Sequence, residues 1–297
     1  MIPSPWTSRE ALMRHARILA LTATALLAAG TATASAEADR GRPAQPRLQT
    51  TYSDFTGNTA TINAGQYGGA SVACPTGWYP ASGGGGSDTS ATSNSLTMVR
   101  SEPYYNIGDN RGWSVEWFNT GPNVEQVWAT VVCSPAYHFL SLGAQETVAP
   151  GTAKSWFAAC PGVNPATGGA FESYDTGTGQ PLRFNSSYPD TGDAPNWWHV
   201  TATNETSAPA DAGAYAVCGP SGPRTIATQS KVVPQATSDE VDVFCPSGMV
   251  AAGGGGLAGD FTYLRASEPS DSRWIVRYGN TSRSPQTVTA YAVCVPA

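Results

Sequence analysis

Apolar and polar residues alternate with a period of two along several short stretches of the chain, which is the pattern of half-buried β-strands. From position 113 to 117, two Trp and one Val fall on one face, while Ser114 and Glu116 fall on the other. The stretch Thr287–Cys294 alternates in the same way and is rich in β-branched and aromatic residues. No stretch of ten or more residues beyond the N-terminal segment shows the 3.6-residue period of a helix. The pattern predicts an all-β protein with very little helix.

The chain repeats itself three times. The frame Trp-x-Val-x-x-x-Asn begins at Trp113, Trp198 and Trp274, and each Asn is followed 14 positions later by a cysteine. Upstream, every copy has a Cys-Pro step, a glycine cluster and a Ser-x-Pro step, in that order. These markers begin at Cys74, Gly83 and Ser101, at Cys160, Gly168 and Ser187, and at Cys245, Gly253 and Ser267. The order and spacing predict three tandem repeats of roughly 80 residues, at 50–135, 136–220 and 221–297.

Each repeat is predicted to hold about four antiparallel strands: one into the opening Cys, one after the glycines, the Trp strand and the closing strand. A further strand is predicted ahead of the opening Cys, at Tyr137–Val148 and Ile226–Val233. The glycine clusters indicate a bend or a close approach between backbones. The short joints between repeats favour repeats that pack against one another, and a pseudo-threefold β-prism of three sheets around a common core is one architecture that fits. Three small β-sandwiches in tandem are the alternative.

Six cysteines in an exported chain indicate three disulfides. Because each repeat has one opening and one closing cysteine, the economical pairs are Cys74–Cys133, Cys160–Cys218 and Cys245–Cys294. Each pair closes a long loop, which the chain-entropy model values at about 4 kcal/mol. The cysteines are far apart and include no CxxC, so we expect neither a metal site nor a cofactor.

The N-terminus has the features of an export signal. Positive charge at Arg9, Arg14 and Arg17 precedes an apolar run, Ile18–Ala29, that is too short to span a bilayer, and a small-x-small site ends at Ala36. We therefore predict a signal peptide over 1–36, a disordered leader over 37–49 and a secreted, extracellular protein without a membrane span. Its net charge of −6 and its low lysine content argue against nucleic acid as a partner.

The repeats also resemble known families. The Cys-Pro-x-Gly openings at Cys74–Gly77 and Cys245–Gly248, each closed by a later Cys, resemble the repeat of vitelline membrane outer layer protein I, whose family is a threefold β-prism. The second copy departs from it at Cys160–Gly162. The Trp frame and the AYAVC segments are similar to a module of secreted actinobacterial proteins, mostly of unassigned role. Jacalin-type lectins share the prism architecture, which would imply sugar binding at loop ends.

Motifs of catalysis are largely absent from the sequence: it has no Gly-x-Ser-x-Gly, no His-Glu-x-x-His and no P-loop. His199 occupies a Trp-strand position where the other copies have Ser114 and Ile275, so we interpret it as a surface residue. Glu102 and Glu268 lie at equivalent positions and are interpreted as exposed turn residues rather than paired catalytic carboxylates. We predict that the protein is not an enzyme.

The segment between the Ser-x-Pro step and the Trp differs in every copy, and loops on a repeated scaffold commonly carry binding functions. Aromatic rings beside Asp and Asn are suited to sugars, since rings pack on C–H faces and polar groups bond hydroxyls. The predicted ligand residues are Tyr104, Tyr105, Asp109, Asn110, Asp190, Asp193, Trp197 and Asp271. The recurring Trp113, Trp198 and Trp274 are predicted to be core residues.

The predicted function is thus lectin-like recognition of glycan or cell-wall polysaccharide. The alternative is a structural or interaction protein of the cell envelope or extracellular matrix, and a more distant one is a glycan-acting hydrolase.

Overall fold

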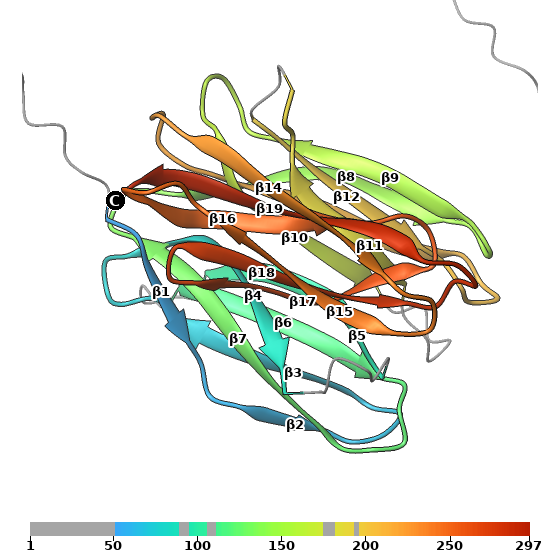
Figure 1. Cartoon of the computed structure of the whole chain (residues 1–297). Coiled ribbons are helices and arrows are strands. Elements are labelled where there is room, and N and C mark those ends of the chain that lie inside the picture. The colour runs from blue at the N-terminus through green and yellow to red at the C-terminus, as the bar shows by residue number, and fades with distance from the viewer. Residues whose placement is uncertain (1–50, 89–94, 106–110, 175–181, 193–195) are drawn as a thin grey trace, which may run out of the picture. The chain divides into compact units, whose positions relative to one another are not determined.

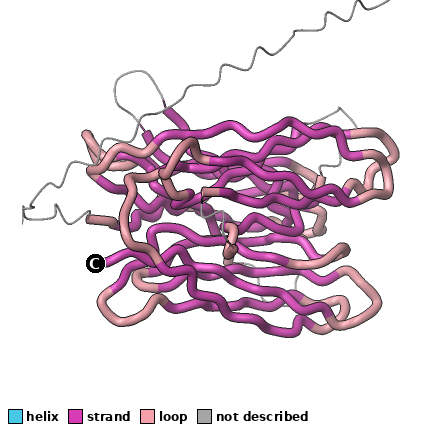
Figure 2. The backbone as a smooth tube through the Cα atoms, turned by 90° about the horizontal axis from the view of Figure 1, so that it is seen from above, coloured by secondary structure: helices cyan, strands magenta, loops and turns pink. Residues whose placement is uncertain are grey.

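The computed structural model describes residues 51–297 except 89–94, 106–110, 175–181 and 193–195. Residues 48–297 belong to one compact unit. The described residues form 19 strands and no helix, as the alternating pattern predicts (Figure 2). No helix that could cross a membrane occurs among them. The predicted signal peptide and leader lie outside the described residues.

The strands form three sheets, which we name A, B and C (Figure 1). Sheet A has the order β1 (Ser53–Thr56), β7 (Glu125–Ser134), β4 (Tyr79–Ser87), β17 (Thr262–Ser270), β18 (Arg273–Asn280) and β15 (Ser238–Phe244), and β2 (Ala60–Ile62) also pairs with β7. Sheet B has the order β3 (Tyr67–Ala73), β6 (Arg111–Asn119), β5 (Leu96–Tyr105), β10 (Ala166–Tyr174), β13 (Ala210–Cys218) and β8 (Phe139–Val148). Sheet C has the order β14 (Thr225–Val233), β19 (Gln286–Pro296), β16 (Met249–Leu257), β11 (Arg183–Pro189), β12 (Trp197–Thr203) and β9 (Ala153–Ala159).

Each sheet is assembled from two repeats. The glycine strand of the first repeat, β4, pairs with β17 of the third, β10 of the second pairs with β5 of the first, and β16 of the third pairs with β11 of the second. This cyclic exchange gives the three repeats equivalent places around one continuous core. The arrangement agrees with the pseudo-threefold prism and excludes three sandwiches in tandem, because a separate sandwich would keep its strands within one repeat.

The repeats contain more strands than the sequence pattern predicts. The second and third have six strands each, and the first has seven. The predicted strands ahead of the opening cysteines are present as β8 and β14, but the glycine clusters lie inside strands β4, β10 and β16 and not at bends. Because glycine has a low strand propensity, the sequence pattern does not predict these strands. The predicted close approach is present: a Cβ on Gly84 would lie 1.7 Å from the backbone oxygen of Ser267.

The Ser-x-Pro serine and the Trp of each repeat are hydrogen-bonded inside the core. The indole Nε1–H donates to the serine Oγ at 2.9 Å in the pairs Trp113–Ser101, Trp198–Ser187 and Trp274–Ser267. The three indoles are fully buried, so a bond to the only polar atom of each ring removes the cost of burying it. The same serines pair with the glycine strand of another repeat or lie directly beside it. The Trp residues are therefore core residues, as predicted.

The recurring Asn holds the loop that follows the Trp strand. Asn119, Asn204 and Asn280 are fully buried. The Asn204 amide donates to the carbonyls of Val148 at 2.7 Å and Ala208 at 2.8 Å, and its oxygen accepts from the Thr206 N–H at 2.9 Å. A single side chain thereby satisfies the backbone of the loop and of the end of β8.

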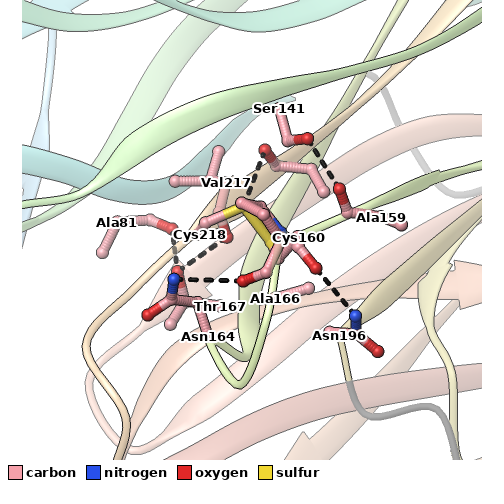
Figure 3. Close-up of a disulfide and its surroundings, with 12 residues drawn as sticks. Ala81, Ser141, Ala159, Cys160, Asn164, Ala166, Thr167, Asn196, Val217 and Cys218 are labelled. Atoms are coloured by element: carbon pink, nitrogen blue, oxygen red, sulfur yellow. Dashed lines mark hydrogen bonds between the residues drawn. A yellow bond between two sulfur atoms is a disulfide. The ribbon is translucent and has the colours of Figure 1, made fainter.

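The three disulfides are the pairs that the repeats predict: Cys74–Cys133, Cys160–Cys218 and Cys245–Cys294. The Cys160–Cys218 bond lies where sheet C meets sheet B, since Cys160 follows β9 and Cys218 ends β13 (Figure 3). At this corner the Ser141 Oγ of β8 donates to the Ala159 carbonyl of β9 at 2.6 Å.

Candidate functional site

The predicted ligand residues lie on three hairpins that belong to three different sheets. Tyr104 and Tyr105 end β5 of sheet B, Asp190 and Trp197 flank the β11–β12 loop of sheet C, and Asp271 lies in the β17–β18 turn of sheet A. Asp109, Asn110 and Asp193 lie outside the described residues. The predicted set is therefore divided among the sheets, and each hairpin has its own surroundings.

Tyr104 contacts its own hairpin, whereas Asp271 is bonded to strand β1. The Tyr104 phenol lies over Gly112, where a Cβ would be 2.7 Å from its oxygen. Asp271 has a left-handed backbone with φ of 55°, and its N–H donates to Asp54 Oδ2 at 3.4 Å.

Asp190 and Trp197 belong to a larger assembly of rings on the outer face of sheet C. Phe157 of β9 pairs in register with His199 of β12, which pairs with Tyr188 of β11. Tyr188 stacks on Tyr291 of β19, across the junction between the second and third repeats, and Trp197 stacks on Phe157. We call these five residues, Phe157, Trp197, His199, Tyr188 and Tyr291, the aromatic row. It crosses the strands, so its exposed surface runs across the sheet.

The rings of the row are packed against one another. The centroids of Phe157 and Trp197 are 4.3 Å apart with planes 6° from parallel, those of Tyr188 and His199 are 5.2 Å apart, and those of Tyr188 and Tyr291 are 5.3 Å apart. Phe157 is 44% exposed, and Tyr291 is buried at the other end of the row. Trp197, His199 and Tyr188 are half-buried. Mutual stacking fixes the ring positions before any ligand arrives.

The other repeats build the same strand positions without aromatic rings. In the first repeat the positions of Phe157, Trp197, His199 and Tyr188 are occupied by Ser71, Gly112, Ser114 and Glu102. In the third repeat the same four positions are occupied by Asp242, Arg273, Ile275 and Glu268. The scaffold therefore does not require these four rings. Their concentration on one face of one sheet is specific to the second repeat, and this is the strongest indication of a site.

A fixed polar pair lies beside the row. The Asp190 carboxylate accepts a hydrogen bond from Gly192 N at 2.6 Å and lies 2.8 Å from His199 Nε2. Burial raises the Asp190 pKa, but the bonds from His199 and Gly192, with the nearby charge of Arg224, outweigh it, and the net pKa is lowered. The carboxylate is therefore ionised at neutral pH, and His199 Nε2–H is the donor. The pair presents a fixed acceptor next to the rings.

Tyr105 belongs to a second aromatic group, at the joint between the first two repeats. The Tyr79 ring lies edge-on to Tyr137 at 5.1 Å, Tyr137 stacks on Phe139 at 6.0 Å, and the Arg111 guanidinium lies 4.2 Å above the Tyr79 ring. Burial, with a further contribution from Tyr137, raises the pKa of Tyr105 to about 12. We call Tyr79, Tyr105, Tyr137 and Phe139 the joint cluster. Tyr137 is 64% exposed.

On the equivalent faces of sheets B and A, a carboxylate occupies the position of Tyr188. On sheet B, Arg100 lies within 3.8 Å of carboxylate oxygens of Glu102, Glu116 and Glu172. Burial, and then Glu172, raises the pKa of Glu102 to about 7. On sheet A, Glu268 accepts from Trp128 Nε1 at 2.7 Å. Both Glu102 and Glu268 are thus half-buried strand residues, and the prediction that they are exposed turn residues is wrong.

Sequence reasoning missed four members of the row: Phe157, Tyr188, His199 and Tyr291. His199 does lie on a surface strand, as predicted, but its partners come from strands that are far apart in the sequence. A usable signal was present, because aligning the three copies position by position shows where only the second has a ring. Within the described part of the chain, no group of three or more His, Cys, Asp and Glu side chains is arranged to hold a metal ion.

No protein-family model matches the chain, and no curated protein is significantly similar to it in sequence. The resemblance to vitelline membrane outer layer protein I thus stays a prediction from the repeat motifs.

Proposed function

We propose that this protein is a secreted, non-enzymatic carbohydrate-binding protein and that the aromatic row on sheet C contacts the sugar. The observation that carries the proposal is the convergence of four rings specific to the second repeat, Phe157, Trp197, His199 and Tyr188, on one sheet face. Asp190 adds a fixed charged acceptor beside the row, next to His199. The export signal predicted at the N-terminus and the three disulfides support a place outside the cell.

The row offers the two kinds of contact that sugars need. Ring surfaces pack against the C–H faces of a pyranose, and a carboxylate accepts hydrogen bonds from hydroxyls. The Asp190 carboxylate has about four lone-pair positions, and its bonds to His199 and Gly192 do not use all of them. Because the rings are already stacked, little side-chain entropy is lost on binding.

The chemistry of the row favours sugars whose substituents are all equatorial. Such pyranoses have two flat C–H faces, and β-linked chains of them present these faces repeatedly along their length. The ligand class that we propose is therefore a β-linked glucan or a chitin- or peptidoglycan-type polysaccharide.

The proposal is tested by retention of the purified protein on insoluble cellulose, chitin and peptidoglycan, together with a glycan array. We expect the wild type to bind at least one of these glycans, and Trp197→Ala and His199→Ala to lose most of that binding. The matched control is Ile275→Ala, which changes the equivalent strand position on sheet A. Equal binding by the wild type and by Trp197→Ala and His199→Ala would overturn the assignment of the site.

The alternative, an interaction protein of the cell envelope, rests on the same row, since exposed aromatic patches also mark protein interfaces. It is favoured if no glycan retains the wild type.

A further inference from the structure

The joint cluster and the aromatic row lie on either side of a single disulfide. Trp197 pairs in register with Ala159, the residue before Cys160. Cys160 is bonded to Cys218, and Cys218 pairs in register with Phe139 of the joint cluster. Figure 3 shows the corner, where Cys160 also accepts at its carbonyl from Asn196 Nδ2 at 2.7 Å. The pairing of β12 with β9, the disulfide, and the pairing of β13 with β8 therefore connect the two groups of rings.

The backbone path between the two groups is short. The path from Trp197 to Phe139 crosses two strand spacings, one residue step and a Cα–Cα distance of 5.5 Å at the disulfide. The backbone positions of Trp197 and Phe139 are accordingly no more than about 20 Å apart. The Ser141–Ala159 hydrogen bond fixes the same corner from the other side. Trp197 and Phe139 both lie in strands, so the paired strands and the disulfide set the separation of their backbones.

The rings of the joint cluster, like those of the row, are absent from the other repeats. The counterparts of Tyr79 are Pro165 and Val250, and strand pairing places Thr51 and Pro223 at the position of Tyr137. Tyr137 is the most exposed member and lies between Tyr79 and Phe139, which orient its ring from both sides. A purely structural role would not explain why Tyr137 is exposed, or why an aromatic residue occupies this position in the second repeat alone.

We propose that the joint cluster is a second contact region for the same glycan, so that the protein recognises a chain of several sugar units rather than a single terminal sugar. This inference rests on the proposed function of the row. It adds that affinity depends on chain length and that this dependence comes from Tyr137 and its neighbours. The Cys160–Cys218 disulfide holds the two regions at a constant separation.

The test measures Kd for cello- and chito-oligosaccharides of two, four and six units by titration calorimetry. For the wild type we expect the hexasaccharide of the recognised series to bind about tenfold more tightly than the disaccharide, the effect of one added ring contact. Tyr137→Ala should remove this gain and leave disaccharide binding unchanged. Tyr137→Phe, which keeps the ring, should restore it. Because Tyr137 is largely exposed, each variant should keep the wild-type melting temperature, which is checked alongside.

The outcomes separate the two proposals. If the wild type binds oligosaccharides but its affinity is the same for two and six units, or if Tyr137→Ala keeps the full chain-length gain, the second region does not exist and the row remains the site. If Trp197→Ala also leaves all affinities unchanged, or if the wild type binds neither these oligosaccharides nor insoluble cellulose, chitin or peptidoglycan, the proposed function fails and the inference fails with it. If the wild type is retained on an insoluble glycan but binds no oligosaccharide of two to six units, the inference alone fails.

Discussion

Gly254 of β16 packs so closely against the indole of Trp274 in β18 that a Cβ on Gly254 would lie 2.3 Å from Trp274 Cγ. The contact recurs in the other repeats, at 2.4 Å between Gly83 and Trp113 and at 2.0 Å between Gly169 and Trp198. The recurring glycines and the recurring Trp are therefore one structural unit: the indole occupies the space that a side chain would need.

Gly254→Ala should destabilise the fold strongly. The new methyl would meet both the Trp274 ring and the backbone oxygen of Tyr291, 2.4 Å away, and neither can move without disturbing the core. We expect the free energy of unfolding in guanidinium, with disulfides intact, to fall by about 3 kcal/mol. Gly222→Ala is the control, since nothing lies within 4 Å of its Cβ position, and it should change stability by less than about 0.5 kcal/mol. Similar losses for the two variants would contradict this packing.

Asn204→Ala should also destabilise the protein, by about 3 kcal/mol, because it removes the buried amide that donates to the carbonyls of Val148 and Ala208 and the oxygen that accepts from the Thr206 N–H. The isosteric Asn204→Asp should be at least as damaging, since it replaces the donor with a buried acceptor. The exposed Asn123→Ala is the control and should be nearly neutral. Denaturant unfolding monitored by circular dichroism gives the values. A near-wild-type Asn204→Asp protein would show that the amide donor is unimportant.

His138 should make the fold less stable in acid. The imidazole is fully buried, and its Nδ1–H donates to the Ala136 carbonyl at 2.8 Å. Burial lowers the pKa of His138 from 6.5 to about 4. Between these values the unfolded chain binds a proton that the folded protein does not. The stabilisation is therefore complete above about pH 6.5 and is lost as the pH falls towards 4, by about 3 kcal/mol in all.

The measurement compares unfolding free energies at pH 7.5 and pH 4.5 for the wild type and His138→Asn, whose amide can replace the Nδ1–H donor. Carboxylates affect both proteins equally, so the difference between them isolates His138. We expect the variant to lose about 3 kcal/mol less than the wild type over this range. Parallel pH profiles would show that His138 titrates normally in the folded state.

Much of the scaffold could be predicted from the sequence because the three repeats can be aligned with one another. Cysteine pairing, the buried Trp and the all-β class follow from three aligned copies. The exchange of strands between repeats could not be predicted, since spacing along the chain does not say which repeat supplies the neighbour of β4 or β16. The glycine strands were missed because glycine is typical of turns, and their role becomes clear only when the Trp274 indole is seen to fill the space above Gly254.

The site was predictable only in part. Asp190 and Trp197 were identified from the variable loop. Phe157 joins them only through strand register, which pairs it with His199, 42 positions later, and Tyr188 joins them by pairing with the same His199, 11 positions later. Tyr291 comes from another repeat altogether. Asp271 was included because its loop also varies, yet the prism places that loop on a different sheet.

The most direct test of the aromatic row compares two phenylalanines of similar exposure. Phe157, in the row, is 44% exposed, and Phe244, at the end of β15 on sheet A, is 61% exposed. Binding isotherms on the glycan that retains the wild type should show about tenfold weaker binding for Phe157→Ala and an unchanged Kd for Phe244→Ala. If Phe157→Ala binds as tightly as the wild type, or both variants weaken binding equally, the row is not the glycan site.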